Sequence, residues 1–299
     1  MKRWTACVAL LALLSSAAVA AEKPKPLRFA PFKDDLFGYQ NIVSSADAGA
    51  YLTIDFNRQR DVIGRDLVPE KTAQPDRIDL AVTKLQSDQL LEDHGVRVRY
   101  VEVGDIEKPA KAAFIFVHGF QGNRFQGVDD QMFGGNFNRL KNLVIKAGGV
   151  YLSPGLGNEG DTGTNQVEVV MREFAKNSPG APIFLACSSN GGKVCWKIAG
   201  DPEMAKLLGG VVLLGATSGF SFLDSPVPRQ YRIPILIAHG SGDRIISGDA
   251  SVQLYKTMRS TMPDYPVRLV VFKSGAHGTP MRLIDWRDTL NWMAANDGR

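Results

Sequence analysis

Short apolar runs alternate with amphipathic stretches along the chain from about Ala50 onward. The later runs are continuous and rich in Val, Ile and Leu, which is typical of parallel strands that are covered on both faces. We expect strands at 50–56, 96–103, 112–118, 149–153, 183–187, 211–214, 235–238 and 267–272.

Two segments between and after these runs repeat apolar residues at i, i+3, i+4 and i+7, the spacing of one helix face. They are Val167, Val170, Met171 and Phe174, and then Leu283, Trp286, Leu290 and Met293. Alternating strands and helices imply a mostly parallel sheet with right-handed crossovers. We therefore predict a single α/β domain over 49–299, with an eight-stranded sheet and helices on both faces. Residues 57–95 are an insertion or long connection without an assigned role, and 21–48 form a charged, proline-spaced leader.

The first 20 residues have the features of an export signal. Lys2 and Arg3 precede an apolar stretch at 6–14, and Ala18-Val19-Ala20 supplies the small residues that a signal peptidase cuts after. The apolar stretch is too short to span a bilayer, which needs about 20 residues. We expect a periplasmic or secreted protein that is cleaved after Ala20 and has no stable membrane anchor.

Charge and cysteine content limit the partners of the chain. Loss of Lys2 and Arg3 lowers the formal charge from +4 to +2, and no basic run with interleaved aromatic residues remains, so we expect no nucleic-acid partner. Cys187 and Cys195 remain, and an oxidising compartment permits a bond between them, but the sequence leaves open whether their geometry suits one. Two cysteines without a histidine partner do not make a metal site.

The segment ACSSNGG at 186–192 follows a predicted strand and contains two adjacent serines. A serine nucleophile needs a tight strand-to-helix turn with small residues two before and two after it. Ser189 has Cys187 and Gly191 at these positions, whereas Ser188 has Ala186 and Asn190, so the pattern favours Ser189. The alternative is an ordinary helix N-cap at either serine.

A general base and an acid follow Ser189 in the chain. His277 comes directly after the last predicted strand, in VRLVVFKSGAHG, and Asp243 follows the strand before it, in ILIAHGSGDRII. Both loops are at carboxyl ends of strands, from which an imidazole can reach the serine turn and a carboxylate can orient the imidazole. Asp224 and Asp249 are rivals for the acid role, and we favour Asp243 because it directly follows its strand.

The backbone N–H of Phe120, after His118-Gly119, and that of Asn190 are candidates for an oxyanion hole. We assign His118 to loop organisation, and His94 and His239 to structural or surface roles.

The segments VHGF, CSSNGG, HGSGD and GAHG, each after a strand and in this order, resemble the α/β-hydrolase superfamily over roughly residues 96–296. Cys187 stands where the usual turn has Gly. The SNGG ending is similar to that of secreted feruloyl, acetylxylan and polyester-cleaving esterases. The resemblance implies a Ser189–Asp243–His277 triad, an acyl-enzyme intermediate, and no metal or organic cofactor.

The expected substrate is a small or polymer-linked carboxylic ester. About 20 residues, 217–233, separate two strands where a lid is often inserted in this superfamily, so we expect little or no lid. Phe120 and Phe220 are candidate substrate-binding residues, and Phe125, Met132, Phe133 and Phe222 either shape the site or belong to the core. The alternatives are a peptidase or amidase with the same triad, and a non-catalytic binding or scaffold protein with this fold. The oligomeric state stays open.

Overall fold

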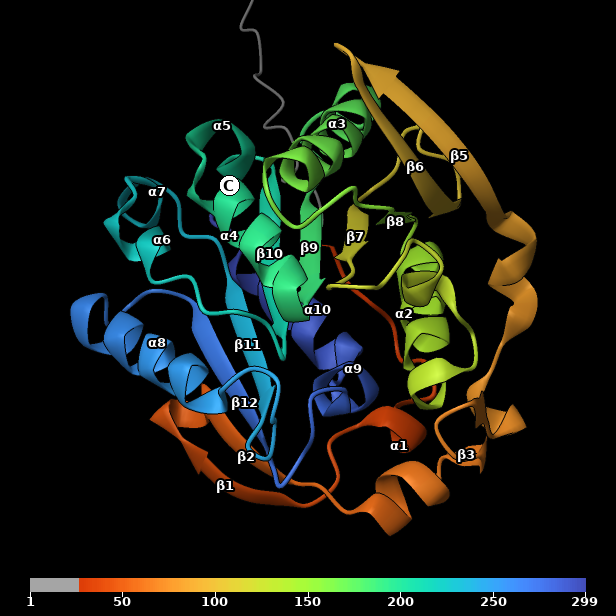
Figure 1. The fold of residues 1–299 in the computed structure, drawn as a ribbon, viewed down its shortest axis with the longest axis vertical. Helices are drawn as coiled ribbons and strands as arrows, with labels where there is room; N and C mark the ends of the chain where they lie inside the picture. The colour runs from red at the N-terminus through yellow and green to blue at the C-terminus, as the bar shows by residue number, and fades with distance from the viewer. Residues whose placement is uncertain (1–26) are drawn as a thin grey trace, which may run out of the picture.

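The computed structural model describes residues 27–299, so the predicted export signal lies outside the described residues. A ten-stranded sheet forms the centre of the domain (Figure 1). Its strands, in spatial order, are β1 (Ile42–Ala46), β2 (Tyr51–Asp55), β12 (Val267–Lys273), β11 (Ile235–Gly240), β10 (Leu208–Leu214), β9 (Ile183–Ser188), β7 (Ala113–Val117), β8 (Val150–Pro154), β6 (Val96–Val103) and β5 (Gln86–Asp93).

The seven strands from β2 to β8 in this order are parallel, and the remaining three pair antiparallel at the two edges. All eight predicted strands are present. The predicted strand count was wrong because two edge strands, β1 and β5, lack an apolar run: every residue of β1 is exposed, and β5 (QSDQLLED) has no buried residue. An edge strand that is exposed to water needs no continuous apolar sequence.

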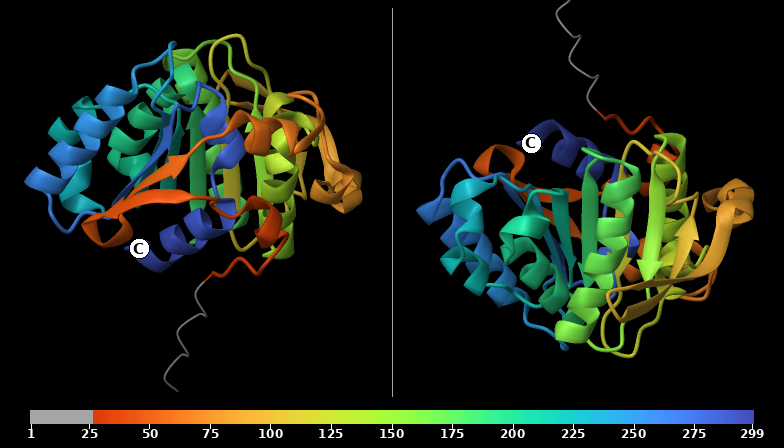
Figure 2. Two further views of the ribbon diagram at one scale, coloured as in Figure 1. Left: turned by 90° about the horizontal axis from the view of Figure 1, so that it is seen from below. Right: turned by 90° about the horizontal axis from the view of Figure 1, so that it is seen from above.

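Helices cover both faces of the sheet, as predicted (Figure 2). They are α1 (Asp34–Phe37), α2 (Asn136–Lys146), α3 (Asp161–Asn177), α4 (Gly192–Gly200), α5 (Pro202–Ala205), α6 (Ser221–Asp224), α7 (Val227–Gln230), α8 (Gly248–Thr261), α9 (Thr279–Leu283) and α10 (Trp286–Asn296). Apolar residues of α3, α4 and α8 pack on one face of the sheet, and those of α2 and α10 pack on the other. The predicted 283–293 helix is divided, because Asp285 caps α10 by accepting from the N–H groups of Arg287 and Asp288.

The described part of the predicted leader belongs to the folded domain. Phe29 and Phe37 are buried, and β1 pairs with β2. The domain therefore begins before residue 49. No helix within residues 27–299 is both long and apolar enough to cross a membrane.

The 57–95 segment is folded. It begins with a π-helical turn at Gln59–Ile63, continues through the hairpin of β3 (Asp66–Val68) and β4 (Thr72–Ala73), and ends in β5. Its ion pairs include one between the neighbours Arg60 and Asp61 and an exposed one between Arg58 and Glu70. Asp66 of β3 also pairs with Arg282 of α9, so the segment is attached to the helix that follows the last strand.

Candidate active site

The loops after β7, β9, β11 and β12 leave the same edge of the sheet, because these strands are parallel. They carry Phe120, Ser189, Asp243 and His277, respectively. Open α/β sheets bind ligands in the crevice beyond the carboxyl ends of their strands. The chain thus gathers every predicted catalytic residue at the edge where such sites form.

The turn after β9 holds Ser189 in a strained conformation. Its φ is +51°, a region that residues with a side chain rarely adopt, whereas Ser188 has an extended backbone and a buried side chain that is 2% exposed. A Cβ on Gly191 would lie 2.6 Å from the carbonyl oxygen of His118, so the +2 position has room only for glycine. Strained residues cluster at functional sites, and of the two serines it is Ser189 that has the strained backbone.

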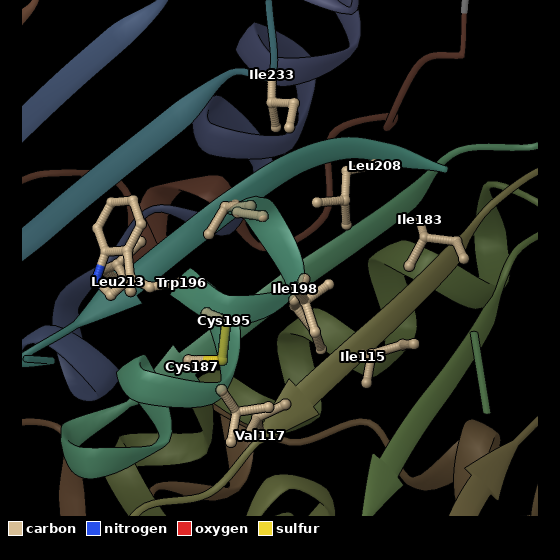
Figure 3. Packing of buried hydrophobic residues seen from close by; sticks show 14 of the residues in the cluster. Ile115, Val117, Ile183, Cys187, Cys195, Trp196, Ile198, Leu208, Leu213 and Ile233 are labelled. Atoms are coloured by element: carbon tan, nitrogen blue, oxygen red, sulfur yellow. A yellow bond between two sulfur atoms is a disulfide. The ribbon is translucent and has the colours of Figure 1, made fainter. Parts of the chain in front are cut away.

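A disulfide joins the strand before this turn to the helix after it. Cys187 of β9 and Cys195 of α4 are bonded, with a Cα–Cα distance of 6.1 Å that suits a disulfide (Figure 3). Cys195 lies eight residues after Cys187, in the first half of α4, and the turn between them places it next to the end of β9. The spacing in the sequence alone left this contact open. Both cysteines are fully buried among apolar residues, so the bond braces the turn from the core side.

His277 and Asp243 form a hydrogen-bonded pair. Nδ1 of His277 lies 2.7 Å from Oδ2 of Asp243, and the Asp243 side chain is completely buried while that of His277 is 20% exposed. Because an ionised carboxylate only accepts, Nδ1 carries the proton. Nε2 of His277 is therefore the basic nitrogen, as general-base chemistry requires.

Four hydrogen bonds hold the Asp243 carboxylate. Oδ1 accepts from the N–H groups of Ile245 and Ile246, and Oδ2 accepts from His277 and from Nε2 of His239 at 3.1 Å. Burial alone would raise the pKa of Asp243, but the bonds from His277 and from the two backbone N–H groups hold the pKa of this carboxyl below its usual range. The carboxylate is ionised at neutral pH and fixed in one orientation.

The role of His239 was incompletely predicted. It is buried, as a structural residue would be, but it also contacts the carboxylate of Asp243. Its Nε2 lies 3.0 Å from the carbonyl oxygen of Ile246 and therefore carries the proton, while Nδ1 accepts from the Ser251 hydroxyl at 2.8 Å. The sequence held one signal for this contact: His239, near the end of β11, and Asp243, in the loop after it, are only four residues apart.

Burial lowers the pKa of His239 below its usual range, and the bond to the Ile246 carbonyl only partly opposes this effect. The folded protein thus keeps His239 neutral where the unfolded chain binds a proton, so we expect stability to fall as pH drops from about 7 to about 5. One such proton changes the free energy of unfolding by at most about 1.4 kcal/mol per pH unit.

Urea unfolding of the unmodified protein and of His239→Gln at both pH values tests this expectation. The pH dependence should be smaller in His239→Gln, which cannot take up the proton, and unchanged in the control His94→Gln, whose side chain is 94% exposed. An equal pH dependence in His239→Gln and the unmodified protein would contradict the assignment.

The candidate oxyanion loop lies against the serine turn. A Cβ on Gly119 would lie 2.6 Å from the Cβ of Ser189 and 3.2 Å from its Oγ, so glycine permits this contact. Within residues 27–299, neither the N–H of Phe120 nor that of Asn190 donates to another group. His118 holds the loop, since its Nε2 accepts from the N–H of Leu156 and its Nδ1 bonds to the carbonyl oxygen of Gly119. Both N–H groups therefore stay candidates for the oxyanion hole.

The two alternative acids lie apart from His277. Asp224 ends α6 and Asp249 lies in the first turn of α8, and neither hydrogen bonds to His277 in the described part of the chain. Ser189 and His277 are not joined by a hydrogen bond in the described structure. Only the short helices α6 and α7 lie between β10 and β11, in agreement with the predicted lack of a large lid.

The aromatic candidates fall into three groups. Phe120, Phe125 and Phe220 are exposed by 67%, 49% and 40%, and so are available to a ligand. Met132 and Phe133 line a pocket beside His277. Phe222 is 1% exposed and packs against Trp196 and Tyr265, so it belongs to the core.

Within residues 27–299, no three His, Cys, Asp or Glu residues are grouped as metal ligands would be.

The chain matches no protein-family model and no curated protein sequence. It is similar to solved structures, among them a thermostable esterase, with a TM-score of 0.56 and 15% identity over 72% of this chain and 64% of that one. An esterase from Pyrococcus furiosus has a TM-score of 0.52 and 11% identity, over 73% of this chain and 96% of that one. A predicted CIB-like hydrolase from Thermoplasma acidophilum has a TM-score of 0.50 and 14% identity, over 70% of this chain and 98% of that one.

At these identities the likeness is one of fold. The mostly parallel sheet with helices on both faces is consistent with it. The chain therefore has the α/β-hydrolase fold.

Proposed function

We propose that this protein is an exported serine hydrolase that cleaves carboxylic esters. The observation that carries the proposal is the hydrogen bond of His277 to the buried carboxylate of Asp243, 2.7 Å long, at the sheet edge that also holds the strained turn of Ser189. A fold with this edge hosts many functions, so the argument rests on the side chains rather than on the fold. Export rests on the sequence of the first 20 residues.

The proposed reaction proceeds through an acyl-enzyme. Oγ of Ser189 attacks the ester carbonyl carbon while its proton moves to Nε2 of His277, and the N–H groups of Phe120 and Asn190 stabilise the oxyanion. The C–O bond to the alcohol then breaks, and His277 gives its proton to the departing oxygen. A water molecule, deprotonated by His277, attacks the acyl carbon; the bond to Oγ then breaks, and His277 returns the proton to Ser189 as the acid leaves.

Asp243 supports both halves of this reaction. Its carboxylate holds the Nδ1–H tautomer of His277 and stabilises the imidazolium that forms when Nε2 takes the proton. Its other hydrogen bonds, from His239 and from two backbone N–H groups, prevent it from turning away. None of these steps requires a metal ion or an organic cofactor, and the substrate is a small or polymer-linked ester.

Labelling with a fluorophosphonate tests the proposal without knowledge of the natural ester. This probe reacts with an activated serine, so we expect one adduct on the purified protein, located by mass spectrometry at Ser189. Protein unfolded in urea and the variant His277→Gln serve as controls and should label at least about 100-fold more slowly, because a serine without its base is a weak nucleophile. Folded protein that takes up no label would instead support a non-catalytic binding protein.

A further inference from the structure

The 57–95 segment forms one wall of a pocket that the catalytic mechanism does not use. The pocket has a volume of about 420 Å³. Its lining residues are Phe56, Arg58, Val62, Glu70, Met132, Phe133, Ala276, Gly278, Thr279 and Arg282. Cavities of this size hold small organic ligands.

The pocket begins at the backbone of His277. Ala276 and Gly278, the residues on either side of His277, both line it. A Cβ on Gly278 would lie 3.5 Å from Cε1 of Phe133, an ordinary van der Waals distance, so the phenyl ring lies next to the histidine loop. A group bound here is next to the residue that moves protons in the proposed reaction.

The charges that line the pocket are already paired. Arg58 Nη1 lies 2.7 Å from Oε1 of Glu70, and Arg282 Nη1 lies 2.9 Å from Oδ1 of Asp66. A charged ligand would have to compete with these ion pairs and lose its own hydration. The remaining lining side chains are mainly apolar, which favours an uncharged apolar group.

The volume sets a scale for that group. A closed apolar cavity of about 150 Å³ is sufficient for benzene. The pocket beside His277 is more than twice as large, so an acetyl or methyl group would leave most of it empty. A long or branched apolar chain, or a group larger than one ring, would fill it and displace water from its apolar walls.

The wall that the segment contributes is held in place. Asp66 and Arg282 form an ion pair in which both side chains are buried, and this pair joins β3 to α9, the helix after His277. Val62 is 3% exposed within its π-helical turn, whereas the next residue, Ile63, is 37% exposed and does not line the pocket. A fixed wall can discriminate between ligands by shape.

We propose that this pocket receives a bulky, uncharged apolar group of the ester substrate, so that the 57–95 segment determines substrate specificity. The inference rests on the proposed ester hydrolysis and extends it to a class of substrate. Val62 and Met132 line the pocket from two different segments, so a larger side chain at either position would reduce its volume.

The test compares Val62→Trp with the neighbouring control Ile63→Trp. We would measure kcat/KM for p-nitrophenyl acetate and octanoate, which lengthen the acyl group, and for methyl and octyl acetate, which lengthen the alcohol. In one of the two series, Val62→Trp should lower the long-to-short ratio of kcat/KM at least about tenfold, as expected when a pocket loses space for an apolar group. Ile63→Trp should leave the ratio unchanged.

Met132→Trp fills the pocket from another wall and keeps the proposal testable if Val62→Trp does not fold. Folded variants whose ratios match the unmodified protein in both series would overturn the assignment of the pocket. That result differs from failure of the proposed function, in which the unmodified protein neither hydrolyses any of the four esters nor reacts with the fluorophosphonate.

Discussion

Ser189→Ala is expected to lower kcat for ester hydrolysis by about 10⁶-fold, the loss seen when a serine hydrolase is deprived of its nucleophile. The reason lies in the turn after β9, where Ser189 has the strained φ of +51° and lies against the candidate oxyanion loop at Gly119. Alanine has no oxygen with which to form the acyl-enzyme. Any remaining rate would come from the oxyanion N–H groups and substrate binding alone.

Ser188→Ala is the matched control for this prediction. Ser188 ends β9 with an extended backbone and a buried side chain, so its hydroxyl does not face substrate. We expect this variant to retain most of its activity. Steady-state kinetics on a p-nitrophenyl ester, together with the thermal midpoint of both variants, would separate loss of the nucleophile from loss of the fold. Equal losses of activity in two folded variants would show that the register chosen for the turn is wrong.

Asp243→Asn is expected to lower kcat by about 10⁴-fold, because the amide favours the wrong tautomer of the histidine. If the amide oxygen accepts from the N–H groups of Ile245 and Ile246, as Oδ1 does now, the amide N–H₂ faces His277. Nδ1 of His277 must then accept, which leaves the proton on Nε2. In that state His277 cannot take the proton of Ser189.

Asp224→Asn tests the alternative acid. Asp224 ends α6 and has no hydrogen bond to His277 in the described structure, so this variant should keep kcat within about twofold, as is usual for a surface substitution away from the site. The measurement is kcat for both variants with the same ester, after circular dichroism has shown that both are folded. Near-normal turnover in Asp243→Asn combined with a large loss in Asp224→Asn would move the acid role to Asp224.

The central strands were predictable because burial on both faces demands continuous apolar sequence. The runs at 183–187 and 267–272 appear in the structure as β9 and β12 with ends shifted by one residue. β1 and β5 could not be found in this way, since they are edge strands whose pairing depends on a neighbour rather than on their own apolar residues. The same limit applies to the 57–95 segment, whose position depends on the buried pair of Asp66 with Arg282, 216 residues apart.

By itself, the sequence determined the α/β class, the serine turn, and the order of Ser189, Asp243 and His277 along the chain, because each of these depends on local pattern and on which strand a residue follows. Only the tertiary structure decided that Cys187 and Cys195 are bonded, that His239 shares the carboxylate of Asp243, and that a distant segment lines the pocket beside His277. These features depend on distances and directions between side chains, which pattern and spacing along a chain do not specify.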